Sequence, residues 1–182
     1  MNAWIPLALL PMPSKRLDKI CGYPVEAQEL DMLQVIHEII SSILNPLCDI
    51  ASQSGIEMVC CDEKVRNYIP ILCGWLADYM ENVMIHGISS NRCPIYTAAP
   101  DEFGELSNAS YATRPHPTYV VAFDNSDIHV LNSYGVKNIN NAIWHIPIEP
   151  REIVKPNILH ALLLGMLVHL MKWVQEFLDH VR

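Results

Sequence analysis

Basic residues are scarce in this 182-residue sequence, which has 12 lysines and arginines against 20 aspartates and glutamates and a net charge of −8. A free-standing nucleic-acid-binding domain is normally basic, so this balance argues against one. Charged residues of both signs make up only 18% of the chain, whereas hydrophobic residues make up 51%. This composition excludes a disordered chain and can fill a buried core, within the length of one domain or slightly more.

Several short motifs of common enzymes are also missing. The sequence has no glycine-rich phosphate loop, no Gly-x-Ser-x-Gly and no His-Glu-x-x-His, which argues against the enzyme classes that use them. The first residues show neither a basic segment nor a cleavage site, so we expect no secretory signal and six free thiols in a reducing compartment. The uncharged stretch 158–171 falls short of the ~20 residues that span a bilayer, so we expect a buried helix there and no membrane contact.

Hydrophobic spacing predicts an α/β fold for the first half of the chain. From residue 26, apolar side chains recur at steps of three and four, which is typical of an amphipathic helix, and Pro46 is expected to kink or restart it. A short apolar run predicts a strand over 56–61, a second helical pattern covers 67–79, and another buried strand is predicted over 83–88. This alternation favours a parallel or mixed sheet.

The second half is less regular. Residues 89–118 are rich in serine, asparagine and proline and are expected to form a long loop or insertion. Residues 119–134 fit either a strand or a helix that ends at Gly135, and 138–150 resemble an irregular linker. A long, mostly apolar helix is predicted from Asn157 to about residue 181, packed against a sheet or another helix.

Two aspartates are candidates for chemistry. Asp62 follows an apolar strand, where a carboxylate could hold Mg²⁺ at the sheet edge, and the alternative is an Asx-turn with Glu63 and Lys64. Asp78 is expected to end a helix, where an anion is disfavoured, which suggests either a functional task or an ion pair with a nearby arginine.

Three further candidates lie in loops or at the start of the last helix. Cys93 is followed by Tyr96 where a zinc knuckle would have a second cysteine, so a free thiol is the simpler interpretation. Asn157 suits a helix N-cap. His160 would lie in the first helical turn, where it could bind metal or phosphate, or could be a histidine satisfied by the backbone at the edge of the core.

Taken in order, these segments resemble the Plavaka transposases of fungal genomes, within the Kyakuja-Dileera-Zisupton and CACTA-like group. The resemblance covers most of residues 1–95 and 135–182 and depends on the colinear order of several segments, which end with LGM at 164–166 and KWV at 172–174. Six others precede these two. They are NPLCDIA at 45–51, GIEMVCCD at 55–62, VRNYIPIL at 65–72, ADY at 77–79, NRCP at 91–94 and KPNILH at 155–160.

The resemblance implies an incomplete RNase H-like transposase core, with core segments at 1–95 and 151–182 and a loop-rich insertion and linker at 96–150. In such cores acidic residues hold two Mg²⁺ or Mn²⁺ ions for phosphodiester cleavage and strand transfer. Asp62 would be the metal ligand, Asp78 and His160 would join it as catalytic residues, and Cys93 would be half of a vestigial zinc site. DNA binding through a full-length family protein and a nuclear location are also implied.

The chain departs from the family pattern at several positions. Tyr96 replaces the second zinc cysteine, Asn157 replaces an aspartate, and Met80-Glu81-Asn82 follows Asp78 in place of Pro-Glu-Gln. The regions expected to hold the first catalytic aspartate and the terminal glutamate also fall outside the sequence. We therefore expect an inactive fragment of a transposase core. The alternatives are a non-enzymatic protein that pairs with itself or with a full-length transposase, and a relic without function.

Overall fold

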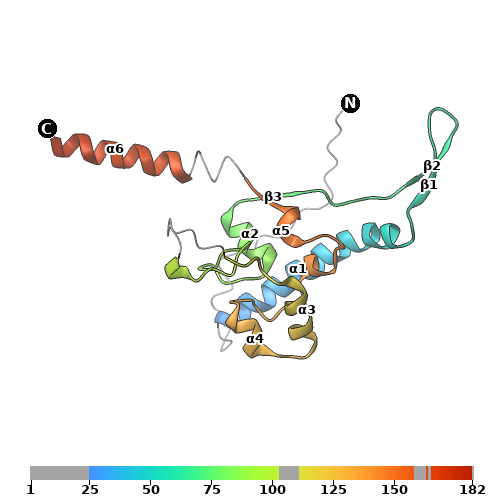
Figure 1. Ribbon diagram of the computed structural model, residues 1–182, viewed down its shortest axis with the longest axis horizontal. Helices are drawn as coiled ribbons and strands as arrows, with labels where there is room; N and C mark the ends of the chain where they lie inside the picture. The colour runs from blue at the N-terminus through green and yellow to red at the C-terminus, as the bar shows by residue number, and fades with distance from the viewer. Residues whose placement is uncertain (1–24, 103–110, 158–162, 164, 182) are drawn as a thin grey trace.

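One long helix and several short ones form the body of the protein, and a β-hairpin and a C-terminal helix project from it in opposite directions (Figure 1). The computed structural model describes residues 25–102, 111–157, 163 and 165–181. Within these ranges the fold is a small mixed α/β domain that is mostly helical, with two sheets of two short strands each. The predicted α/β class is therefore confirmed in this coarse form.

Helix α1, Val25–Ser52, is a single helix of 28 residues that contains Pro46. The amphipathic pattern is confirmed, because Leu33, Ile36 and Ile40 are buried at steps of three and four. The predicted restart at Pro46 is wrong. Pro46 is exposed, so water can satisfy the carbonyl group that loses its helical hydrogen bond.

Strands β1, Ile56–Val59, and β2, Val65–Tyr68, form an antiparallel hairpin in which Ile56 pairs with Tyr68 and Val59 with Val65. The predicted strand at 56–61 is thus confirmed over four residues, but both strands are exposed rather than buried. Gly55 permits the hairpin entry: its φ is +94°, and a Cβ there would lie 2.5 Å from the Tyr68 carbonyl oxygen.

The helix predicted over 67–79 is wrong, as is the strand predicted over 83–88. After β2 the chain stays extended to β3, Trp75–Ala77, since Pro70 and Gly74 disfavour a helix. Helix α2, Tyr79–His86, then occupies the region read as a strand. Four of its residues are buried, which are Asn82, Val83, Ile85 and His86, so burial in this region is confirmed although the strand is not.

The only parallel pairing in the described ranges joins β3 to β4, Val154–Pro156. Between α2 and β4 the described residues form three short helices and two 3₁₀ turns. They are η2, Pro100–Glu102; α3, His116–Asp124; α4, Ile128–Ser133; η3, Ala142–His145; and α5, Pro150–Ile153. The ambiguous stretch 119–134 is therefore helical, and Gly135, with a φ of +64°, follows it as predicted.

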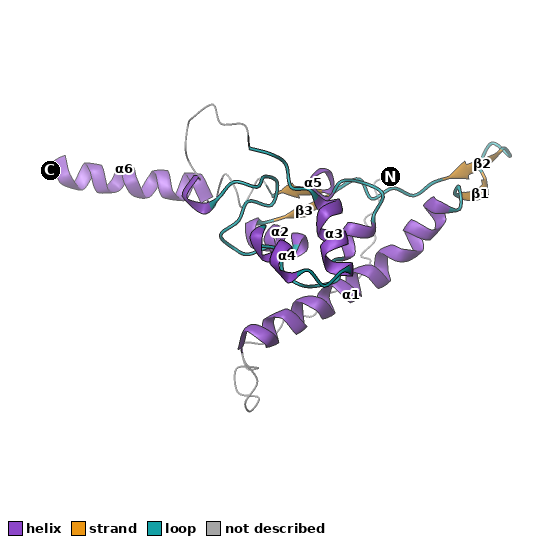
Figure 2. Cartoon of the chain, turned by 60° about the horizontal axis from the view of Figure 1, so that its bottom comes forward, coloured by secondary structure: helices purple, strands orange, loops and turns teal. Residues whose placement is uncertain are grey.

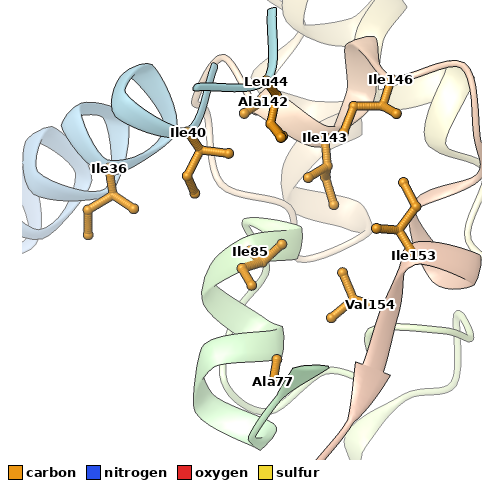
Figure 3. Close-up of a cluster of buried hydrophobic side chains, with 10 residues drawn as sticks. All are labelled: Ile36, Ile40, Leu44, Ala77, Ile85, Ala142, Ile143, Ile146, Ile153 and Val154. Atoms are coloured by element: carbon orange, nitrogen blue, oxygen red, sulfur yellow. The ribbon is translucent and has the colours of Figure 1, made fainter. Parts of the chain in front are cut away.

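Two hydrophobic clusters hold the body together. The first joins α1, α2, η3 and β4 around Ile40, Ile85 and Ile143 (Figure 3). The second packs α3 and α4 against α2 around Tyr119 and Leu131. Figure 2 shows α2, α3 and α4 gathered along the middle of α1. Residues far apart in sequence thus fix the position of α2. The residue that precedes this helix, Asp78, belongs to the candidate site.

The prediction of a long apolar helix packed on the body is wrong. The C-terminal helix is α6, Val168–Val181. It is a 14-residue amphipathic helix, preceded by a π-helical turn at 165–167, and its side chains are exposed. The residues between Asn157 and this turn lie largely outside the described ranges. Among the described helices, none is long and apolar enough to cross a membrane.

Candidate functional site

The carboxyl ends of β3 and β4 bring two of the predicted site residues to one edge. Ala77 pairs with Pro156 in the parallel register, so Asp78 and Asn157 each follow the last residue of their strand. The Asn157 backbone N–H also donates to the Ala77 carbonyl oxygen at 2.7 Å. In α/β sheets ligands bind outside the carboxyl ends of parallel strands, so this edge is the candidate site.

Asp78 begins a helix rather than ending one. Its backbone is extended, with φ −71° and ψ −179°, and its carboxylate accepts a hydrogen bond from the Glu81 N–H at 2.7 Å as the N-cap of α2. A carboxylate is favoured at this end of the helix dipole, which removes the predicted anomaly. Glu81 in turn accepts from the Trp75 indole N–H at 3.3 Å, which links α2 to β3.

Asp62 lies on the exposed β1–β2 hairpin, away from the β3–β4 edge (Figure 1). Its two carboxylate oxygens accept hydrogen bonds from the two Arg66 amino groups, each at 2.7 Å. Arg66 accordingly lowers the pKa of the Asp62 carboxyl. The Lys64 N–H also donates to Asp62 at 3.3 Å, as in the Asx-turn alternative.

The described side chains do not fit a two-metal centre. Mg²⁺ prefers oxygen ligands, carboxylates above all, and two such ions need several of them. Asp62 uses both oxygens on Arg66, Asp78 caps α2, and Asn157 carries a neutral amide. Nor do His, Cys, Asp and Glu side chains gather in threes at a possible ion site in the described part of the chain. His160 lies outside it.

Cys93 sits in a loop that does not fit a zinc knuckle. Its half-buried Sγ accepts the Tyr96 N–H at 3.4 Å, so the turn places residue 96 where a second thiol would be needed, but that residue is a tyrosine. Arg114 holds the loop instead, by donating from Nε to the Cys93 carbonyl oxygen at 2.5 Å. The expectation of free thiols is confirmed for the described cysteines, which are Cys48, Cys60, Cys61, Cys73 and Cys93.

Sequence reasoning missed a buried polar cluster between α2 and α3. The His86 and His116 rings lie with centroids 6.0 Å apart and are only 3% and 5% exposed. Arg114, equally buried, donates to the Tyr119 hydroxyl at 3.2 Å and the Tyr134 carbonyl oxygen at 3.0 Å. These residues are spread over almost 50 positions with no repeated spacing, so no motif could have identified them.

Burial sets the charge state of the two histidines in this cluster. Desolvation by burial, with charge repulsion from the Arg114 guanidinium as a smaller cause, lowers the pKa of His86 and of His116 to about 4. Glu149, whose carboxylate lies 3.5 Å from His116 Nδ1, is the nearest acid. At neutral pH both rings are therefore uncharged and serve as part of the core.

The protein is related to DNA transposases. A family model described as Plavaka transposase matches residues 1–174, and the chain belongs to the Plavaka transposase family. This confirms the resemblance inferred from the sequence. Comparison with curated proteins found no match, and comparison with solved structures found none either. The family suggests divalent metal ions as cofactors and DNA as a partner.

Proposed function

We propose that this chain is part of an RNase H-like transposase core and does not cleave DNA by itself. The observation that carries the proposal is the β3–β4 edge, where Asp78 stands beside Asn157 instead of a second carboxylate. One negative charge at this edge cannot balance two divalent cations. Of the residues that the family resemblance assigns to catalysis, Asp78 lies at this edge, Asp62 lies on the hairpin and is bound by Arg66, and His160 lies outside the described residues.

DNA binding and location follow from the same proposal. Phosphate contacts require lysines and arginines, and the 12 in this chain are outnumbered by 20 acidic residues, which gives a net charge of −8. Contact with DNA in the nucleus would therefore depend on basic parts of a full-length family protein. A second candidate function, a non-enzymatic interaction protein, is supported by the exposed apolar side chains of α6.

The purified chain is expected to leave supercoiled plasmid intact in the presence of Mg²⁺ or Mn²⁺. The measurement is the conversion of supercoiled to nicked plasmid on agarose gels, compared with the Asp62→Ala and Asp78→Asn variants. All three proteins should give no more nicked plasmid than the buffer control. Metal-dependent nicking by the wild type that either substitution abolishes would refute the proposal.

Restoring the carboxylate is expected to create measurable cation binding. In Asn157→Asp, two carboxylates would follow the adjacent ends of β3 and β4, which should strengthen Mn²⁺ binding about tenfold or more over the wild type. Mn²⁺ titration followed by electron paramagnetic resonance measures the free ion directly. The matched control is Asp78→Asn combined with Asn157→Asp, which has one carboxylate and should return to wild-type binding. Equal binding by all three proteins would show that this edge holds no metal.

A further inference from the structure

Helix α6 carries an apolar face that is exposed in the described part of the chain. We define this face by the side chains on one side of the helix, which are Leu170, Met171, Trp173, Val174, Phe177 and Leu178. All six are between 46% and 67% exposed. The opposite side is polar and internally bonded, with Lys172 3.9 Å from Glu176 and Gln175 donating to Asp179 at 3.0 Å. An isolated helix of 14 residues is marginal in water, so this face needs a partner.

The body has an apolar groove at the end from which the hairpin projects. Its floor is the C-terminal part of α1, including Leu47, Cys48 and Ala51, and its walls are residues 69–72 and 146–148. Its volume is about 290 Å³, and it has no charged lining residue. Small-molecule sites combine an apolar wall with a few polar groups that orient the ligand, and this α1 groove lacks such side chains. It is better suited to an apolar helix, as in helix-in-groove recognition.

We propose that α6 of one copy binds the α1 groove of a second copy, so that two chains exchange their C-terminal helices. The groove lies at the C-terminal end of α1, and Figure 1 shows this end of α1 and helix α6 on opposite sides of the body, so the two are apart within one copy. A reciprocal exchange makes the same contact twice around a two-fold axis and leaves neither surface open. The inference rests on the second candidate function, the interaction protein, and is independent of catalysis.

The exposed area is sufficient for a stable dimer. Trp173 is 63% exposed and Phe177 is 67% exposed. An aromatic side chain buries roughly 150–250 Å², so these two side chains and the groove surface that they cover would remove roughly 1,000 Å² over both contacts. The other four apolar residues bring the total into the range of about 1,200–2,000 Å² that is typical of specific interfaces.

Two matched pairs of surface variants test the exchange in the full chain. Phe177→Glu places a charge on the apolar face of α6, and His169→Glu places one on its polar face. Ile71→Glu places a charge in the groove at a 67% exposed position, and Val121→Glu places one on exposed α3. Light scattering coupled to size exclusion gives the mass, and thermal melts followed by circular dichroism confirm that each variant is folded.

The wild type, His169→Glu and Val121→Glu are expected to have twice the mass of one chain, and Phe177→Glu and Ile71→Glu the mass of one. An equimolar mixture of those two variants should form a dimer that is weaker than the wild type, because the intact groove of one accepts the intact α6 of the other and only one of the two contacts is restored. A wild-type monomer would overturn the proposal. So would a dimeric Ile71→Glu beside a monomeric Phe177→Glu, since α6 would then pair with α6. Neither outcome affects the plasmid result, so the two proposals fail separately.

Discussion

Acidification from about pH 7.5 to about pH 5 is expected to lower the free energy of unfolding by about 4 kcal/mol through two buried histidines alone. His86 and His116 have a folded-state pKa of about 4 against an ordinary value of 6.5. The unfolded chain therefore binds protons more readily than the folded one between these values. Their contribution to stability is complete above pH 6.5 and declines as the pH falls towards 4, and the part lost by pH 5 is about 2 kcal/mol per ring.

The surroundings of the two rings oppose protonation. Arg114 repels a proton on either ring, and Arg151 repels one on His116. Among the described residues the acid in contact is Glu149, 3.5 Å from His116 Nδ1, and its side chain is 45% exposed, so solvent screens its charge. Protonation of one ring also disfavours the other, whose centroid is 6.0 Å away. Acid should therefore open the packing of α3 against α2 before other parts of the body.

Urea unfolding at the two pH values measures this effect. Substituting one ring, in His86→Phe or His116→Phe, should remove about half of the pH-dependent difference, and the double variant should remove most of it. His129→Gln is the matched control, because His129 is exposed on α4. A double variant that kept the full difference would show that other groups are responsible.

The sequence identified the elements whose residues repeat at one period over a long stretch. Helix α1 was predictable because its buried face, including Leu33, Ile36 and Ile40, repeats at helical steps along 28 residues. Helix α2 was mistaken for a strand because it has only eight residues and buries Asn82, Val83, Ile85 and His86 on more than one side. A short segment that is buried on several sides shows no period, so length and caps are the better guides. Asp78 and Gly87 are those caps.

The candidate edge was only partly predictable for a similar reason. Asp78 and Asn157 were both singled out from the sequence, but their proximity depends on pairing between strands of three residues about 80 positions apart. Asp62 was assigned a role from its place after an apolar run, and that run proved to be an exposed hairpin rather than a buried strand. The apolar pattern of a strand does not say whether the rest of the chain covers it.

The buried polar residues that fix α2 also lie beyond the reach of sequence reasoning. The fully buried Asn141 donates from its amide nitrogen to the Ile85 carbonyl oxygen at 3.0 Å and accepts from the Ile143 N–H at 3.0 Å. His37, also fully buried, bonds to the Met84 carbonyl oxygen at 3.2 Å and accepts from the Ala142 N–H at 3.3 Å. Together they join α1, α2 and η3.

Replacing Asn141 by leucine is expected to lower the free energy of unfolding by about 3 kcal/mol, because two buried backbone groups lose their partners. The Ile85 carbonyl oxygen would lose its donor from Asn141, and the Ile143 N–H would lose its acceptor. Urea unfolding at neutral pH gives the size of the loss, and hydrogen exchange should show a faster rate at the Ile143 amide. If Asn141→Leu lost less unfolding free energy than the control variant Asn140→Ala, the two hydrogen bonds of Asn141 would not be needed for stability.

Asn140→Ala is the matched control. Asn140 is the exposed neighbour, and its side chain bonds only to His145 at 2.8 Å among the described contacts, so its loss should change stability by less than about 1 kcal/mol.

The same pair of variants tests whether Asn141 supports the candidate edge. Because Asn141 anchors the last turn of α2 and Asp78 caps its first turn, Asn141→Leu combined with Asn157→Asp should bind Mn²⁺ more weakly than Asn157→Asp alone. Asn140→Ala in the same background should leave that binding unchanged, which separates loss of the anchor from a general effect of mutation near η3.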